Sequence, residues 1–437
     1  MSSSTIKLQE NWAPRFFTIW GGQAFSLFGS ALVQFALIWW LTQETGSATV
    51  LATATLFGLL PQIVLGPFSG PLIDRWSRRL VMIFADAGIA ISTAVLAYLF
   101  WSGQVQTWHV YAALFIRSIG GAFHWPAMQA STTMMVPEKH LARVAGMNQT
   151  LQGLVSIAAP PTGALLIGWI PTQGVLMIDV VTAIIAILPL LFLPVPQPVR
   201  QVHPDSDGKH PGYWQDVKEG IRYVFAWPGL LAVLTMFMLV NFLFNPLGAL
   251  MPLLVTQYFK KGALALGSMD SLWGIGMISG GVLLSIWGGF KQKISTMLAG
   301  TVVAGLGVLV VAAAPSNAFW LALTGFFIMG IAIPIINGPA MALLQTIVRP
   351  EVQGRVLSLV GSMVIAMSPL SLMIAGPLSD AYGIRVWFWI AGILCTLIAI
   401  IGFFIPTIMN IETSHNEPAK GTTPVSETSS SKFSNNG

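Results

Sequence analysis

Charged residues are scarce in this sequence. Only 8% of its 437 residues are Asp, Glu, Lys or Arg, 54% are hydrophobic, and the mean hydropathy is +0.74. A typical soluble domain carries about a quarter of its residues as charged side chains, so this composition excludes a soluble globular protein. The basic residues are dispersed between apolar runs, and the net charge of +5 therefore does not indicate a nucleic-acid partner.

The sequence has one cysteine and none of the common hydrolase motifs. The single cysteine, Cys395, lies in an apolar run, which excludes a disulfide framework and a thiolate metal site. The sequence has no GxxxxGK[ST] loop, no HExxH and no GxSxG, so ATP hydrolysis and intramembrane proteolysis by this chain are not expected. We expect no cofactor, no metal and no enzymatic activity, and an ion or solute gradient as the energy source of any transport.

Long apolar runs fill the chain. Each has about 20 or more residues, enough to cross about 30 Å of hydrocarbon as a helix, and the first is far longer than a signal-peptide core. The twelve runs are residues 16–41, 48–72, 79–101, 108–134, 146–170, 173–194, 229–257, 264–288, 293–314, 318–347, 355–378 and 385–408. The sequence predicts an all-α membrane protein with twelve transmembrane helices.

Lysine and arginine placement predicts the orientation. If both termini are cytoplasmic, 17 of the 21 lysines and arginines fall in cytoplasmic segments, and three, Lys260, Lys261 and Arg385, fall outside. This asymmetry follows the positive-inside rule. The remaining cation, Arg117, lies within a predicted span.

The two halves of the chain repeat each other. The tripeptide PAM at residues 126–128 and the PE pair at 137–138 recur 213 residues later. Duplicated six-span units are common in secondary transporters, whose substrate site lies between the halves near the midplane. We expect a cytoplasmic segment 1–15, a first bundle 16–197, a cytoplasmic linker with an interfacial helix 198–228, a second bundle 229–411 and a disordered tail 412–437.

A cationic stretch separates the second and third spans. It contains Gly70, Asp74, Arg75, Arg78 and Arg79. One interpretation is a positively charged loop that only orients the protein. The other is a latch, in which Asp74 lies against the positive N-terminal end of a neighbouring helix and Gly70 permits close packing.

Arg117, Asp179 and Asp86 are ionisable residues within predicted spans. Arg117 is about 13 Å from the end of its span, where a charge must face protein or water and so indicates a function; the alternative is a structural clamp on backbone carbonyls. Asp179 lies at a compatible depth, and we hypothesise that this pair separates when the acid is protonated. Asp86 is either a second titrating group or the partner of a static salt bridge to Arg78 or Arg79.

Several stretches resemble one family. Residues 70–79 are similar to the signature loop between helices 2 and 3 of the major facilitator superfamily, with Ser77 where the family prefers glycine. Residues 115–127, FIRSIGGAFHWPA, resemble its helix-4 motif, which is associated there with proton coupling. Together with WGGQA at 20–24, TGSA at 45–48 and RVLSLVGS at 355–362, they resemble the macrolide-efflux branch of bacterial drug:proton antiporters. The resemblance implies two pseudo-symmetric six-helix bundles in a bacterial cytoplasmic membrane.

The resemblance also implies roles for further residues. Glu138 would close a charge network with the arginines of the signature loop, and Pro160 with Gly163 partly matches the motif of exporters in this superfamily. Spans 1, 4, 7 and 10 would line the cavity. The polar and aromatic candidates on them are Trp20, Gln23, Gln34, His124, Asn241, Asn245 and Asn337.

A neutral, aromatic lining of this kind suits bulky amphipathic molecules better than small ions. We therefore expect a monomeric exporter of an amphipathic drug, for which the resemblance implies a macrolide and exchange for protons. Two alternatives stay open: a nutrient, siderophore or lipid carrier of the same fold, and a membrane receptor or scaffold that transports nothing.

Overall fold

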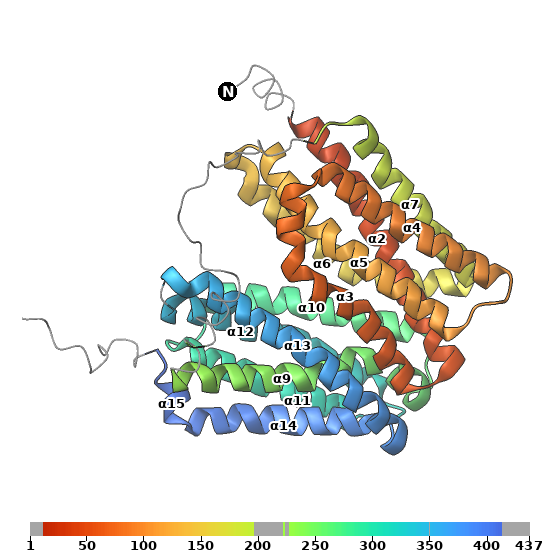
Figure 1. Cartoon of the computed structure of the whole chain (residues 1–437). Coiled ribbons are helices and arrows are strands. Elements are labelled where there is room, and N and C mark those ends of the chain that lie inside the picture. The colour runs from red at the N-terminus through yellow and green to blue at the C-terminus, as the bar shows by residue number, and fades with distance from the viewer. Residues whose placement is uncertain (1–11, 196–221, 223–226, 349, 413–437) are drawn as a thin grey trace, which may run out of the picture.

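The computed structural model describes residues 12–195, 222, 227–348 and 350–412 (Figure 1). The first bundle consists of α2 (Trp12–Thr45), α3 (Ala48–Arg75), α4 (Arg78–Trp101), α5 (Thr107–Met135), α6 (Glu138–Trp169) and α7 (Thr172–Phe192). The second consists of α9 (Pro228–Leu253) with a π-helical turn η1 (Leu254–Tyr258), α10 (Ala263–Trp287), α11 (Lys293–Ala313), α12 (Phe319–Ile347), α13 (Pro350–Tyr382) and α14 (Arg385–Phe404). A short α15 (Pro406–Met409) follows.

Each of the twelve predicted spans is a helix, which confirms the all-α architecture. Among the described residues, eleven helices are long and apolar enough to cross a membrane; α5 has the length but is more polar. Two boundaries were wrong. Helix α6 begins at Glu138 and not near 146, because a helix continues past the apolar run that a hydropathy pattern detects, and residues 12–15 belong to α2 and not to a separate lead-in. The predicted interfacial helix within 198–228 and the tail lie outside the described residues, except for residues 222, 227, 228 and 412.

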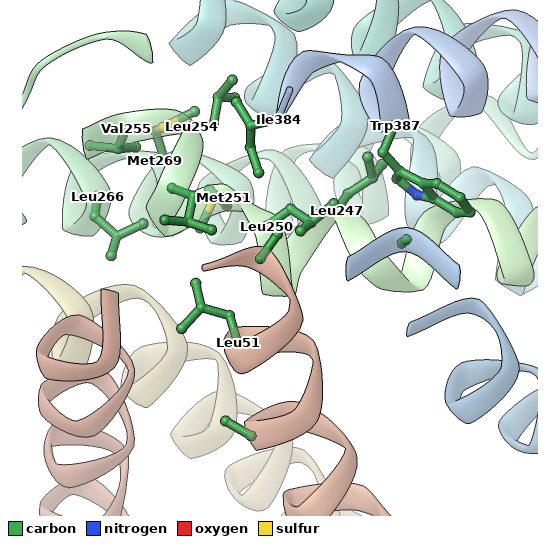
Figure 2. Packing of buried hydrophobic residues seen from close by; sticks show 14 of the residues in the cluster. Leu51, Leu247, Leu250, Met251, Leu254, Val255, Leu266, Met269, Ile384 and Trp387 are labelled. Carbon is green, nitrogen blue, oxygen red and sulfur yellow. The ribbon is translucent and has the colours of Figure 1, made fainter. Parts of the chain in front are cut away.

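The two bundles form the upper and lower parts of Figure 1 and meet along two helix pairs, α3 with α13 and α6 with α10. One large apolar cluster runs across this boundary. In Figure 2, Leu51 of α3 projects toward Leu250 and Met251 of α9, and all three are buried. Burial of this apolar surface holds the two halves together on this side.

A carboxylate of one half caps a helix of the other half. Asp380, near the end of α13, accepts hydrogen bonds from the backbone N–H groups of Ala48 (2.7 Å) and Thr49 (2.9 Å) and from the Ser47 hydroxyl (2.9 Å). These N–H groups have no partner within α3, and the helix dipole favours an anion there. Nearby, Gln257 Nε2 donates to the carbonyl of Gly46 at 2.6 Å. We call this end of the molecule the closed end.

A hydrogen bond that depends on a proline joins α6 to α10 across the same boundary. Pro161 has no N–H, so the carbonyl of Ile157, four residues earlier, loses its helical donor. The hydroxyl of Ser271 on α10 donates to that carbonyl at 2.8 Å. Gly267 allows the approach, because a Cβ there would lie 2.9 Å from the backbone of Pro161. The proline therefore exposes an acceptor that the opposite half uses.

We expect Asp380→Asn to open the closed end in a larger fraction of molecules. The substitution removes the anion from the α3 N-terminus, and because Asp380 is exposed to solvent we expect an effect of about 1 kcal/mol, or roughly a fivefold shift. Spin labels at Glu44→Cys and Lys261→Cys, in a Cys395→Ser background, would report a longer distance by electron resonance.

The matched control is Glu412→Gln. Glu412 caps α11 by accepting from the N–H of Ile294 at 3.0 Å, a contact within the second half, so the label distance should stay as in the parent. Equal distance distributions for Asp380→Asn and the parent would show that the cap does not hold the two halves together.

Candidate functional site

A cavity of about 570 Å³ lies within the first bundle. Helix α2 contributes one face to it, since Trp20, Gln23, Leu27, Ser30 and Gln34 recur at intervals of three or four residues. The other walls come from α3, α4, α5 and α6, and among them are Thr55, Gln62, Asp86, Arg117, His124, Trp125 and Asn148. The lining thus combines aromatic rings with amides and three ionisable groups.

Arg117 and Asp179 form a buried ion pair beside this cavity. Nη1 of Arg117 lies 2.5 Å from Oδ2 of Asp179, and their side chains are 9% and 0% exposed. A pair of opposite charges this deep is retained only if each charge compensates the desolvation of the other. Arg117 contributes to the cavity wall whereas Asp179, on α7, lies behind it. The structure therefore brings together the two residues that the sequence paired.

Two small polar side chains complete this pair. Thr93 accepts a hydrogen bond from Arg117 Nη1 (2.6 Å) and lies 3.2 Å from Asp179 Oδ2, and Ser30 donates to Asp179 Oδ1 (2.9 Å). The carbonyl of Ser30 accepts from Arg117 Nη2 at 3.3 Å. Helices α2, α4, α5 and α7 thus all contact one charge pair, and a change in its protonation would act on all four.

Asp86 has partners other than those expected from the sequence. Its Oδ2 accepts a hydrogen bond from Gln23 Nε2 at 3.0 Å, and its Oδ1 lies 3.4 Å from His124 Nε2. The alternative of a static salt bridge to Arg78 or Arg79 is therefore not what the structure shows. Acid, amide and imidazole form a second polar group on the cavity wall, on helices α4, α2 and α5.

The signature-loop arginines bind carbonyl groups. Arg78 donates to the carbonyl of Ala130 at 2.8 Å, and Arg79 to those of Leu190 and Leu191. Glu138 is exposed at the start of α6 and forms no ion pair with the described side chains. The side chains of Asp74 and Arg75 and the surroundings of Gly70 lie outside the described ones, so the network of Glu138 and the latch at Asp74 both stay predictions.

The exporter-type residues lie where α6 meets its neighbours. Pro160 and Pro161 pack against Gly267 of α10, and Gly163 packs against the ring of Phe35 on α2, 3.0 Å from where its Cβ would be. Proline and glycine here permit close helix contact, as their residue types predicted. Pro160 therefore lies at the interface between the halves and Gly163 lies within the first half, and neither residue lines the cavity.

The candidates of the second half do not line this cavity. Asn241 and Asn245 donate to carbonyls of their own helix, at 2.9 Å to Phe237 and 2.8 Å to Asn241. Asn337 is exposed on α12. In the first half, Trp20 Nε1 donates a hydrogen bond to Asn148 Oδ1 at 2.7 Å, which fixes the orientation of the Trp20 ring. Trp20 is one of the cavity residues that the sequence analysis predicted, and it lines the cavity.

Two acids of the second half escaped the sequence analysis. Asp380 is the closed-end cap, and Asp270 is a partly buried acid inside α10. The rule that singled out Arg117, an ionisable residue within a span, applies equally to Asp270. The role of Asp380 depends on a contact 331 to 333 residues apart in the chain, which no local pattern indicates.

Comparisons with known proteins agree with this geometry. A model of the Major Facilitator Superfamily matches residues 19–288 and 242–436. Macrolide efflux protein A of Streptococcus pyogenes is 36% identical over 391 residues, which cover 90% of this chain and 96% of that protein. The multidrug efflux pump Tap of Mycolicibacterium fortuitum is 26% identical over 400 residues, covering 88% and 94%.

A solved structure shares the fold. The crystal structure of a bacterial homologue of the iron transporter ferroportin, in an inward-facing state, superposes with a TM-score of 0.68 at 13% identity, over 89% of this chain and 98% of that one. At this identity the likeness concerns the fold alone. Sequence and fold agree that this chain belongs to the Major Facilitator Superfamily, a family of multi-pass membrane transporters and not of enzymes, and within it to the branch similar to macrolide efflux proteins.

Proposed function

We propose that this protein exports amphipathic drugs of the macrolide class by alternating access, in exchange for protons. The observation that carries the proposal is the Arg117–Asp179 pair, a fully buried acid joined to a cation on the wall of an aromatic and amide-lined cavity. The names of the relatives, which are macrolide and multidrug efflux proteins, support the substrate class.

The chemistry of the lining supports the same substrate class. A cavity of about 570 Å³ is within the size range of sites for drug-sized molecules. Trp20 and Trp125 offer apolar surface, and Gln34, Gln62 and Asn148 offer neutral hydrogen-bonding groups. Such walls bind a large molecule with scattered oxygens more readily than a small ion, which must replace a whole hydration shell.

The ion pair supplies the coupling. While Asp179 is ionised, Arg117 is held by it and by Thr93. When Asp179 binds a proton, the guanidinium loses its counter-charge and turns toward groups on the cavity wall. Because α2, α4, α5 and α7 all contact the pair, its separation loosens the packing of the whole first half, which permits the change of access. One proton is thereby exchanged against the bound drug.

We further propose that the protein acts in the cytoplasmic membrane of a bacterium as a monomer, with both termini in the cytoplasm. Under this orientation the closed end, with Gly46, Ser47 and Asp380, faces outward. The lysine and arginine asymmetry supports it, because 17 of 21 then lie on the cytoplasmic side or in the cytoplasmic segments. The cavity would then load from the cytoplasmic side.

We expect Asp179→Asn to abolish proton-driven export while leaving drug binding nearly unchanged. The amide cannot release a proton, and it lies behind the wall and not on it. In liposomes with an imposed pH gradient, the initial rate should fall by about tenfold or more. Binding of the same drug, measured at equilibrium, should change by less than about twofold and would show that the variant is folded.

Asp86→Asn is the comparison variant, because it removes the other acid within a predicted span of the first half. Retention of gradient-driven export by Asp179→Asn, with loss in Asp86→Asn, would assign the proton to Asp86 and refute the mechanism above. In the unaltered protein, export that persists after collapse of the pH gradient would exclude proton exchange altogether.

We expect Gln34→Leu to weaken drug resistance in cells that lack their own pumps. Loss of one neutral hydrogen bond in the cavity costs about 1 kcal/mol, or roughly fivefold in affinity. The readout is the minimum inhibitory concentration of a panel of macrolides, with Arg117→Ala as the inactive reference.

Gln43→Leu is the matched control for this panel. It makes the same replacement in the same helix, but at an exposed position near the closed end, and should leave resistance unchanged. If the unaltered protein protects against no drug, export is refuted. Uptake of a nutrient by the same cells would then support a carrier, and no transport of any solute in liposomes a receptor or scaffold.

A further inference from the structure

Asp270 is an acid inside the membrane-spanning helix α10 that no partner neutralises. Among the residues that the structure describes, it accepts no hydrogen bond and forms no ion pair, although it is partly buried. The other acids of the spans differ in this respect. Asp179 is paired with Arg117, Asp86 contacts Gln23 and His124, and Asp380 has three donors.

Among the described residues, no cation lies near enough to form an ion pair with Asp270. Helix α10 packs against α12 and α6. Helix α12 contains no ionisable side chain, and the cations of α6, Lys139, His140 and Arg143, all lie in its first two turns. Since α6 meets α10 at Ile157, 14 residues beyond Arg143, these charges are about 21 Å away along the helix. A carboxylate without a counter-charge in a membrane is costly and indicates a function.

The repeat places Asp270 at the position equivalent to a cavity residue of the first half. Helix α3 begins at Ala48 and α10 at Ala263, so equivalent positions are 215 residues apart. Ala52 packs against Gly376 across the boundary between the halves, and its counterpart Gly267 packs against Pro161 across the same boundary. Three residues after Ala52 comes Thr55, which lines the cavity; three residues after Gly267 comes Asp270.

Several exposed apolar residues of α10 lie on the opposite side of this helix from Asp270. Leu264, Ile275, Val282 and Ile286 are exposed apolar residues, as expected of a face toward lipid. At 100° per residue, Asp270 is turned about 140° away from Ile275. Met277, two turns after Asp270 on the same face, is the counterpart of the cavity residue Gln62.

From this placement we propose that Asp270 is the anionic anchor of the second half, which binds a protonated amine of the transported amphipathic drug. The inference rests on the proposed function and adds the recognition element that the cavity of the first half lacks, since the acids there are already engaged. A drug bound between the halves would place its apolar body against Trp20 and Trp125 and its ammonium group against Asp270. The carboxylate then obtains the counter-charge that the protein does not supply.

The test compares two probes on purified protein. One is a radiolabelled macrolide that carries a tertiary amine, and the other is the same macrolide with that amine converted to a neutral amide. We expect Asp270→Asn to raise the Kd of the amine by roughly ten- to a hundredfold and that of the amide by less than about twofold. Asp270→Glu, which keeps the charge, should retain the preference for the amine.

Two further variants keep the result interpretable. Asp270→Thr copies Thr55 of the first half and serves as a second neutral variant if the asparagine variant does not fold. Asp380→Asn removes another acid of the second half and should leave the ratio of the two Kd values unchanged. Binding of the amide by each variant shows that its cavity is intact.

The remaining outcomes overturn the inference in distinguishable ways. Equal weakening of both probes by Asp270→Asn would indicate a structural role, and no change in either would show that Asp270 does not touch the drug. Unchanged binding of both probes with loss of gradient-driven transport would make Asp270 a proton carrier. If the unaltered protein binds and transports neither probe, the proposed function itself fails.

Discussion

Burial of the Arg117–Asp179 pair is the constraint on which the first half of this protein depends. Either charge alone would be far too costly at this depth, because removal of one partner of a buried pair costs about 3 to 5 kcal/mol. The pair is therefore stable only while both groups are charged, because a proton on Asp179 would leave the guanidinium without its counter-charge. Thr93 and Ser30 satisfy the remaining oxygens, so the pair and four helices form one polar unit. Under the proposed mechanism, a single protonation event would change the packing of a bundle that is otherwise apolar.

The boundary between the halves uses weaker and more reversible interactions. Asp380 is exposed, and a capping carboxylate at the surface contributes only about 1 kcal/mol. The carbonyl of Ile157, released by Pro161, is bound by one hydroxyl. Contacts of this size can break when the two halves part, whereas the extensive apolar contacts inside each bundle stay in place. The contacts inside each bundle are therefore stronger than those between the bundles. This difference allows each bundle to move as a unit while the boundary between them opens.

The sequence predicted the helices well because twelve apolar runs and the repeat of the halves are strong, local signals. It also paired Arg117 with Asp179, since depth along a span can be counted from the chain. It left the partner of Asp86 open, because whether Gln23 or an arginine reaches the acid depends on how α2 lies against α4. An acid that contacts a helix N-terminus is found at Asp380 and α3, at the opposite end of that helix from Asp74, whose own contact stays a prediction. No local pattern indicates Asp380, because its contact depends on tertiary packing.

The two halves share a backbone plan and differ in charge. In the first half, Asp86 and Asp179 each have a cation, an imidazole or a hydrogen-bond donor from their own bundle. The other polar groups of the cavity wall include neutral amides. In the second, Thr55 of the repeat is replaced by Asp270, and no described cation accompanies it. If the acid of each half were neutralised by a partner, the site would contain no group that binds a charged drug. If each half carried an unpaired acid, repulsion between the two carboxylates would oppose closure around a neutral drug. Under the two proposals, one half would respond to protons and the other would hold the charge of the substrate, so that the two ions would be exchanged without competing for the same carboxylate.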